Sequence, residues 1–210
     1  MLQEQTSLTT EERTAVQSQR ATAELIRKVR DGDVQAFEQL FNRYQKRVYN
    51  IVYRMVGNEQ DAADLTQEVF VRVYKSRDML RDEMTFGAWL RTVATNICRD
   101  HFRKVRRTIK ADSLDEPIAF EEGEAQREVE DWSSNPERAL DKKDLREATT
   151  RAMNSLSDEH RTLVVLHHIE GMEVRDIARE LGIPEGTVKS RLARARDELK
   201  RKLGHYVGNG

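Results

Sequence analysis

Apolar residues recur at intervals of three and four along much of the chain, and this spacing places them on one face of a helix. The clearest stripe ends at Gly57, and Asn58 directly after it is suited to cap the next helix. The pattern predicts four N-terminal helices, over about 23–30, 37–55 and 59–74 and from Phe86 into the residues near 104. We expect these helices to pack into one compact domain, residues 21–108.

A second group of helical stripes begins at Pro136, a residue suited to the first turn of a helix. Ser157 is a candidate N-cap within this group, and Gly171 and Gly182 are candidate helix ends. The pattern predicts helices over 136–154, 158–170, 174–181 and 185–203. We find no alternating strand pattern and no internal repeat. The prediction is an all-α fold of two small helical domains, the second over residues 136–204.

Three segments of the chain lack a sustained apolar period. Residues 109–135 are rich in Glu and Asp and predict a flexible acidic linker between the two domains. Residues 1–20 are expected to form a disordered N-terminal tail and residues 205–210 a C-terminal tail. No run approaches the roughly 18 apolar residues of a membrane-spanning helix, and the first residues lack the apolar core of a secretory signal. We therefore expect no membrane insertion of this chain and a cytoplasmic location.

The charge of the chain is balanced in total but divided along its length. The formal net charge is -1, with 36 Lys and Arg residues against 37 Asp and Glu residues. Residues 99–110 carry a net charge of +5, residues 111–141 a net charge of -9 and residues 184–203 a net charge of +4. This division predicts two cationic surfaces separated by an acidic connector, and cationic surfaces are suited to nucleic acid.

The stretch 174–203 has the features of a helix-turn-helix motif, in which the second helix enters the major groove of DNA. Gly182 permits the left-handed turn between the two helices, and the apolar residues of the second helix fall on one face. The residues that project from its other sides are small, hydrogen-bonding or cationic, as contacts with base edges and phosphates require. The candidate DNA-binding residues are Thr187, Lys189, Ser190, Arg191 and Arg194.

The sequence offers little support for an enzyme or a metal site. His167 and His168 are adjacent on a predicted helix and point about 100° apart, so they do not form a chelating pair, although Glu170 lies close by in the sequence. Cys98 and His101 could form half of a zinc site, but the sequence contains no second pair of ligands. Glycine-rich phosphate loops and nucleophile motifs are absent from the sequence. We predict no enzymatic activity, no metal and no cofactor.

Three stretches, in a defined order, carry a resemblance to a known protein family. They are DAADLTQEVFVRVY (61–74), FGAWLRTVATNICRDHFRK (86–104) and GIPEGTVKSRLARARDEL (182–199). With this order and separation, the chain resembles the group 4, or extracytoplasmic-function (ECF), sigma factors of bacterial RNA polymerase, which belong to the sigma-70 family. The resemblance implies that the first domain is sigma region 2 and the second is sigma region 4. It also implies that the chain binds core RNA polymerase, recognises a two-part promoter and promotes DNA melting.

The helix that contains the DLTQE stretch is the expected polymerase-binding element. In the family this helix docks on a coiled-coil clamp of the largest polymerase subunit. The resemblance therefore assigns polymerase binding to Asp64, Gln67 and Glu68. Helical spacing alone also places these three residues away from the apolar stripe of the same helix.

The fourth helix and the loop before it resemble the part of the family that recognises and opens the minus-ten element of the promoter. Opened strands need cations and hydrogen-bonding groups to replace pairing and stacking. Phe86 and Trp89 are aromatic candidates for stacking, but their spacing predicts core positions. The minus-ten candidates are Asn96, Arg99, Asp100, Arg103 and Lys104, with Asn96 and Asp100 favoured for recognition. For the minus-thirty-five element the resemblance favours Lys189, Ser190, Arg191 and Arg194.

Two other classes of protein share some of these features. A stand-alone helix-turn-helix regulator with a helical effector or partner domain would have a similar C-terminal half, but it would not need the DLTQE helix followed by a basic helix. A helical adaptor would explain the helices and not the charge division. The resemblance also implies an anti-sigma protein partner, often membrane-anchored, that clamps between the two domains. The expected partners are thus core RNA polymerase, promoter DNA and an anti-sigma factor.

Overall fold

The computed structural model describes residues 10–80, 83–112, 145 and 147–207. Within these ranges the chain is helical and contains no strand, which confirms the predicted all-α class. Most of the predicted acidic linker lies outside the described residues, as do both ends of the chain and the start of the helix predicted over 136–154. The expectations for those segments stay predictions.

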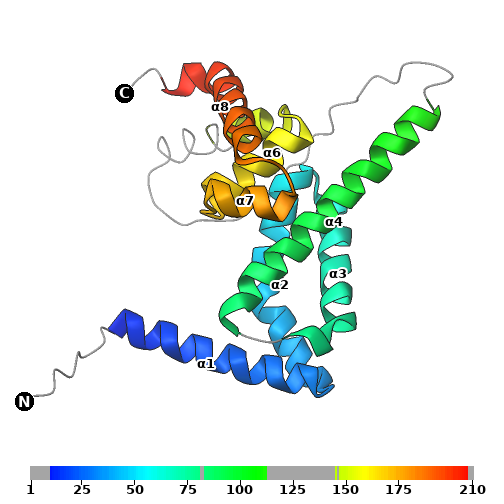
Figure 1. Ribbon diagram of the computed structural model, residues 1–210, viewed down its shortest axis with the longest axis vertical. Helices are drawn as coiled ribbons and strands as arrows, with labels where there is room; N and C mark the ends of the chain where they lie inside the picture. Colours follow the sequence, from blue (N-terminus) through cyan, green and yellow to red (C-terminus); the bar gives the residue numbers. More distant parts are fainter. Residues whose placement is uncertain (1–9, 81–82, 113–144, 146, 208–210) are drawn as a thin grey trace, which may run out of the picture.

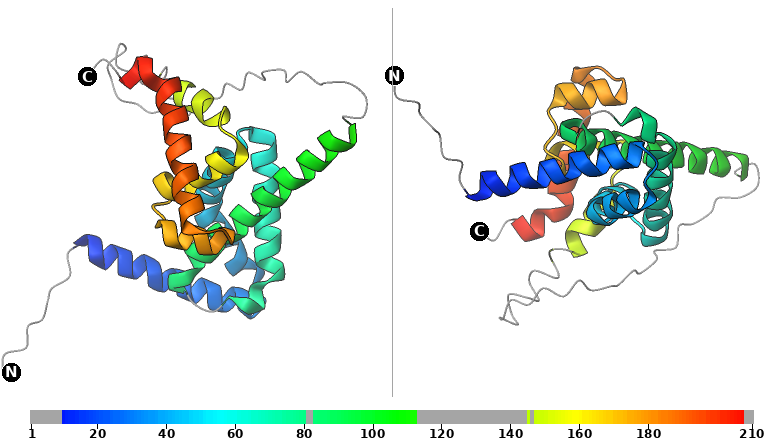
Figure 2. Two further views of the ribbon diagram at one scale, coloured as in Figure 1. Left: turned by 45° about the horizontal axis from the view of Figure 1, so that its top comes forward. Right: turned by 90° about the horizontal axis from the view of Figure 1, so that it is seen from below.

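The described part of the N-terminal half contains four α-helices and a short 3-10 turn. They are α1 (Thr10–Arg30), α2 (Val34–Val56), α3 (Glu59–Lys75), η1 (Arg77–Met79) and α4 (Glu83–Asp112). The helices α2, α3 and α4 pack against one another, and α1 lies across one end of this bundle (Figures 1 and 2).

The described part of the C-terminal half is a group of shorter helices followed by one long helix. Residues 147–154 are helical. They are followed by α6 (Asp158–Val164), the π-helical turn η2 (Val165–Ile169), α7 (Val174–Leu181) and α8 (Glu185–Val207). The single helix predicted over 158–170 thus begins as the α-helix α6 and ends in the π-helical turn η2.

Several helices end where the sequence predicts. Gly57 ends α2 with a φ of 85°, a left-handed conformation that glycine adopts without steric cost. The side chain of Asn58 then begins α3 by accepting a hydrogen bond from the amide of Asp61 at 2.7 Å. Ser157 caps α6 through its side chain, and Gly182 ends α7 with a φ of 67°.

The helix α1 begins earlier than predicted. Because it starts at Thr10, the prediction of a disordered tail over residues 1–20 is wrong for residues 10–20. The helix contains no glycine and no proline, and it is rich in Ala, Glu, Gln and Arg, which have high helix propensity. Apolar periodicity identifies only the part of a helix that packs against the core, whereas propensity can extend the helix beyond that part.

The helices α4 and α8 continue past their predicted ends. The helix α4 ends at Asp112, so the linker predicted from residue 109 is helical at its start. The helix α8 ends at Val207, which corrects the predicted C-terminal tail for residues 205–207, and Gly204 lies inside the helix. A glycine in a helix interior costs only about 1 kcal/mol, and the neighbouring residues of high helix propensity offset this cost.

Aromatic side chains join α2 to α3 and α4. The ring centroids of Phe41 and Phe70 are 4.7 Å apart, and those of Tyr44 and Phe86 are 5.1 Å apart, both in edge-to-face geometry. Phe86 is 2% exposed, which confirms its predicted core position. The fully buried aliphatic and methionine side chains around these rings are Leu40, Val48, Val52, Met55, Val69 and Val73.

The two halves of the chain share one hydrophobic core. The elements α6 and η2 pack against α2, while α8 packs on α6 and α7 packs on η2 (Figure 1). The buried residues of the C-terminal half that join the core of the N-terminal bundle are Leu163, Val165, Leu166, Met172, Ile177, Ala178, Val188 and Leu192. The helix-turn-helix is therefore held against the N-terminal bundle, and we refer to this arrangement as the closed form.

Candidate polymerase and nucleic-acid interfaces

The predicted polymerase-binding residues lie together on the outer face of α3. Asp64, Gln67 and Glu68 are exposed, whereas the apolar stripe of the same helix is buried. The face presents two carboxylates and one amide, which suit a partner with cations and hydrogen-bond donors. Sequence reasoning missed Val71, which lies one helical turn after Gln67 and is 51% exposed. The sequence could have indicated Val71, because it is an apolar residue that lies outside the buried apolar stripe of α3.

A groove lies between α3, η1 and α4. Its volume is about 180 Å³, and it is lined by Arg72, Ser76, Met79, Trp89, Val93, Asn96, Ile97 and Asp100. The favoured minus-ten residues Asn96 and Asp100 are exposed and lie one helical turn apart on α4, so the fold brings both to this groove. We call this the α3–α4 groove.

Trp89 contributes to the α3–α4 groove as well as to the core. The side chain packs against the core but is only half-buried, so its predicted core position is only partly correct. Phe86 and Leu90 are 2% exposed and occupy the centre of the stripe, which leaves Trp89 at the edge. An aromatic ring beside an amide and a carboxylate suits a flipped nucleobase, because a base offers a face for stacking and an edge with hydrogen-bonding groups.

Cations follow the groove along α4. Arg103 and Lys104 are exposed, and Arg103 pairs with Asp100 at 3.1 Å. Arg99 is half-buried, because its Nη2 donates to the carbonyl oxygen of Leu181 at 3.4 Å. The five predicted minus-ten residues thus lie along one helix, and Arg99 alone of these five bonds to the C-terminal half.

The helix-turn-helix is formed as predicted. After Gly182, the amide of Ile183 donates to the carbonyl oxygen of Ala178 at 3.1 Å and closes the turn. Ile177 and Ala178 are buried where α7 meets α8. The short side chain of Ala178 permits this close approach, so α8 is held with its apolar face inward.

Most of the predicted minus-thirty-five residues lie on the exposed side of α8. Lys189, Ser190 and Arg194 are exposed, and Thr187 is half-buried. The hydroxyl of Ser190 donates to the carbonyl oxygen of Thr187 at 3.1 Å. Arg191 differs from the others, because its Nη1 lies 2.9 Å from the Glu159 carboxylate of α6 and its side chain is 33% exposed.

A second groove, which sequence reasoning missed, lies along α2. Its volume is about 420 Å³, and it is lined by Arg43, Lys46, Arg47, Asn50, Ile51, Arg54, Ile169 and Glu170. The basic residues recur at three and four positions on the outer face of α2, and this spacing was the available signal. Glu170 occupies part of the groove through an ion pair with Arg47 at 3.0 Å.

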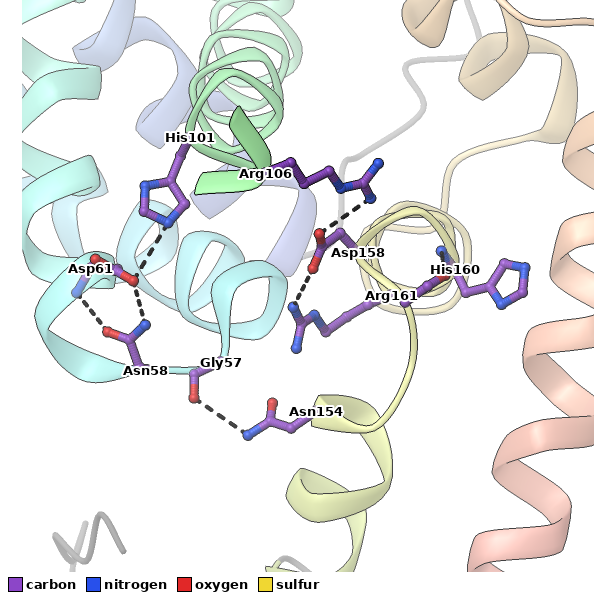
Figure 3. Close-up of polar contacts among 10 residues, drawn as sticks. Gly57, Asn58, Asp61, His101, Arg106, Asn154, Asp158, His160 and Arg161 are labelled. Atoms are coloured by element: carbon purple, nitrogen blue, oxygen red, sulfur yellow. Dashed lines mark hydrogen bonds and ion pairs between the residues drawn. The ribbon is translucent and has the colours of Figure 1, made fainter. Parts of the chain in front are cut away.

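Three of the candidate metal ligands named from the sequence, His167, His101 and Glu170, have other polar partners. The Nδ1 atom of His167 lies 2.8 Å from the carbonyl oxygen of Met172, and His101 lies 3.5 Å from Asp61 (Figure 3). Burial raises the pKa of the Cys98 thiol to about 12. In the described ranges no three His, Cys, Asp or Glu side chains are grouped as metal ligands, and no described helix has the length and hydropathy of a membrane span.

Comparison with known protein families decides the identity of the two halves. Residues 40–108 match the family model of sigma-70 region 2, and residues 146–199 match that of sigma-70 region 4. The two matches together cover more than half of the chain. The chain belongs to the sigma-70 family. The first match includes the α3 face and the α3–α4 groove, and the second includes the helix-turn-helix.

Similar proteins place this sigma factor in the ECF group. The ECF sigma factor SigW of Bacillus subtilis is 33% identical over 179 residues, which cover 85% of this chain and 94% of SigW. The ECF sigma-E factor of Escherichia coli K12 is 33% identical over 181 residues, or 85% of this chain and 92% of sigma-E. The sigma-H factor of Pseudomonas aeruginosa is 31% identical and covers 89% of this chain and 95% of its own length.

Two solved structures, one of them of a sigma factor, share the fold of this chain. The sigma factor RpoE of Bartonella quintana, in complex with the anti-sigma factor NepR, matches with a TM-score of 0.58 at 23% identity, over 81% of this chain and 98% of RpoE. CnrH, in complex with the cytosolic domain of CnrY, matches with a TM-score of 0.54 at 23% identity, over 88% of this chain and 98% of CnrH. These likenesses support the two-domain helical fold.

The family match favours a sigma factor over a stand-alone regulator. A regulator with a helix-turn-helix accounts for the match to region 4 and leaves the match to region 2 unexplained. Sigma factors are transcription initiation factors, so the family also agrees with the prediction that this chain is not an enzyme.

Proposed function

We propose that this sigma factor binds core RNA polymerase through the exposed face of α3 and directs it to a promoter with two separate elements. The α3–α4 groove would receive a base of the opened minus-ten element, and the exposed side of α8 would read the minus-thirty-five element. The observation that carries the proposal is the order of three surfaces in one chain: an acidic helical face, a groove beside a cationic helix, and a helix-turn-helix.

The side chains of α8 suggest a division of labour on duplex DNA. Ser190 and Arg194 have hydrogen-bonding groups that suit base edges, whereas Lys189 is an exposed cation that suits a phosphate. In the α3–α4 groove, Asn96 and Asp100 would contact the polar edge of a base while Trp89 contacts its face. The cations Arg103 and Lys104 would then follow the backbone of the opened strand.

We infer that the sigma factor also binds an anti-sigma protein. RpoE of Bartonella quintana is in complex with the anti-sigma factor NepR, and CnrH is in complex with the cytosolic domain of CnrY. In the proposed function a regulator of this kind would bind surfaces that polymerase and DNA require. Because core polymerase and promoter DNA are its proposed partners, the chain is expected to act in the cytoplasm.

Binding to core polymerase and start-site selection test this function together. The purified chain is incubated with bacterial core RNA polymerase, co-purification is measured, and transcription is then assayed on a library of promoter fragments. We expect the chain to co-purify with core and to confer start sites that core alone does not use. Tight binding to duplex DNA without polymerase, combined with no binding to core, would contradict the proposal.

A further inference from the structure

One carboxylate of α6 joins α4 to α8. The Nη1 atom of Arg106, on α4, lies 3.7 Å from Oε1 of Glu159, and the Nη1 atom of Arg191, on α8, lies 2.9 Å from Oε2 of the same side chain. Asp158 also binds Arg106, with 3.3 Å between Oδ2 and Nη2 (Figure 3). The acidic first turn of α6 therefore neutralises cations from the basic helix of region 2 and from the recognition helix of region 4.

Further polar contacts hold the same two halves together. Arg99 donates to the carbonyl oxygen of Leu181 at the end of α7. Arg47 of α2 pairs with Glu170, whose side chain is only 8% exposed. On the other side of α6, the amide of Asn154 donates to the carbonyl oxygen of Gly57 at 3.3 Å (Figure 3). These contacts surround the shared apolar core and make the closed form a specific arrangement.

The closed form does not have the reach that a two-part promoter requires. Elements centred near minus ten and minus thirty-five are about 25 base pairs, or about 85 Å, apart along B-form DNA. The longest of the described helices, α4, has 30 residues and so measures about 45 Å. Since Arg106 and Arg191 share one carboxylate, α4 and α8 are too close to contact both elements at once.

We propose that Glu159, together with Asp158, acts as an internal substitute for DNA phosphate that holds the free chain closed. In this form Arg106 and Arg191 are bound to α6, and opening releases both for DNA. This proposal rests on the proposed function. It explains how a sigma factor that recognises two promoter elements would not bind DNA until core polymerase separates its two halves. Charge-assisted contacts of this kind are exchangeable, since a phosphate offers the same oxygen acceptors as a carboxylate.

Glu159 is the better of the two acids for a test. Asp158 also pairs with the buried Arg161, so its replacement would disturb folding as well as closure. The side chain of Glu159 is 48% exposed, and both of its ion-pair contacts are to Arg106 and Arg191. Glu147→Gln is the matched control, because it removes the same charge and one exposed ion pair, to Arg151 of the same helical segment.

The experiment compares the full-length wild-type chain, Glu159→Gln and Glu147→Gln without polymerase. Binding is measured by fluorescence anisotropy on a mixed-sequence duplex long enough to span both elements. Opening is measured as the distance between spin labels at Thr108→Cys and Lys200→Cys, two exposed positions on α4 and α8. Cys98 can stay in place, because it is buried and its thiol pKa is about 12.

We expect Glu159→Gln to bind duplex about twofold to fivefold more tightly than Glu147→Gln at low salt, since each exposed ion pair contributes modestly. Its label distances should shift to larger values, and the difference in affinity should shrink as salt screens the ion pairs. With core polymerase bound, the two variants should bind promoter DNA alike, because the chain is then open.

Equal duplex affinity and equal label distances for Glu159→Gln and Glu147→Gln would overturn the inference. If the wild-type holoenzyme still selects start sites in that case, only the internal phosphate substitute is rejected. If the wild-type chain fails to bind core polymerase or to select any start site, the proposed function itself fails. The holoenzyme measurements therefore distinguish failure of this inference from failure of the proposed function.

Discussion

The Nη2 atom of Arg161 lies 3.0 Å from Oδ1 of Asp158, and this arginine is only 6% exposed (Figure 3). Burial lowers the pKa of the Arg161 guanidinium, and the charge of Asp158 opposes that effect. Because Asp158 also binds Arg106 of α4, one carboxylate stabilises a buried cation of region 4 and an exposed cation of region 2. We therefore expect Asp158 to couple the folding of region 4 to its docking on region 2.

Replacement of Asp158 by Asn should destabilise the closed protein. A buried Arg161 that loses its charged partner incurs a cost of desolvation, which we expect to lower the free energy of unfolding by about 1–3 kcal/mol. The measurement is urea unfolding followed by circular dichroism. The exposed pair Glu147–Arg151 is the control, since Glu147→Gln should change stability by at most about 1 kcal/mol. Equal stability of the two variants would contradict the role of Asp158.

Cys98 should resist alkylation in the folded protein. It is fully buried, and burial raises its thiol pKa from 9.0 to about 12, so the reactive thiolate is scarce at neutral pH. Because folding favours the neutral thiol, this contribution to stability is complete below pH 9 and is lost as the pH rises toward 12. We expect maleimide to react slowly with the native chain and rapidly in urea, and rapid reaction of the native chain would contradict this.

The double change Gln67→Ala with Glu68→Ala should weaken binding to core polymerase. Both side chains are exposed, so the helical fold should persist while affinity falls by about 1–2 kcal/mol, or about tenfold. Surface plasmon resonance with immobilised core polymerase measures the affinity. Glu38→Ala, an exposed change on α2, is the control. Normal polymerase affinity of the double variant would remove the α3 face from the interface.

Replacement of Asn96 by Ala should impair opening of the minus-ten element. The change removes hydrogen-bonding groups from the α3–α4 groove, and loss of a good contact with a base costs about 1–3 kcal/mol. Permanganate footprinting of unpaired thymines in the holoenzyme–promoter complex measures opening. Asn42→Ala changes an exposed Asn on α2 and should leave the footprint unchanged. An unaltered footprint with Asn96→Ala would exclude this residue from promoter opening.

Arg194 and Lys189 should differ in how they affect DNA binding. Arg194→Ala is expected to cost about 1–3 kcal/mol on the native upstream element and little on a scrambled one. Lys189→Ala should weaken binding to both sequences and reduce the salt dependence, as loss of a phosphate contact does. Competition assays with native and scrambled elements distinguish the two effects, with the exposed Arg201→Ala as the control. Unchanged discrimination by Arg194→Ala would refute its role in base recognition.

The sequence predicted the local features of the fold well because they depend on neighbouring residues. Gly57, Asn58, Ser157 and Gly182 act at helix ends through their own conformations and side chains, so their roles could be inferred from their positions. The start of α1 could not be placed in this way, because its first turns carry no core stripe and form through helix propensity.

The sequence predicted which residues are exposed on the candidate surfaces, but it did not predict the three-dimensional form of those surfaces. Helical spacing alone places Gln67 and Glu68 outward and Asn96 one turn before Asp100. The α3–α4 groove, which includes Asn96 and Asp100, is also lined by residues such as Met79 and Trp89. These residues come from different elements, so the groove forms only when α3, η1 and α4 pack together. Trp89 was assigned to the core because periodicity does not distinguish the centre of an apolar stripe from its edge.

The sequence by itself determined the helical class, the order of the motifs and the division of charge, since these properties follow from spacing and composition along the chain. Only the tertiary structure decided that region 4 closes on region 2 and that Glu159 binds both Arg106 and Arg191. The physical reason is that these contacts join residues far apart in sequence. Shape complementarity and the burial of apolar surface bring them together, and neither leaves a periodic signal.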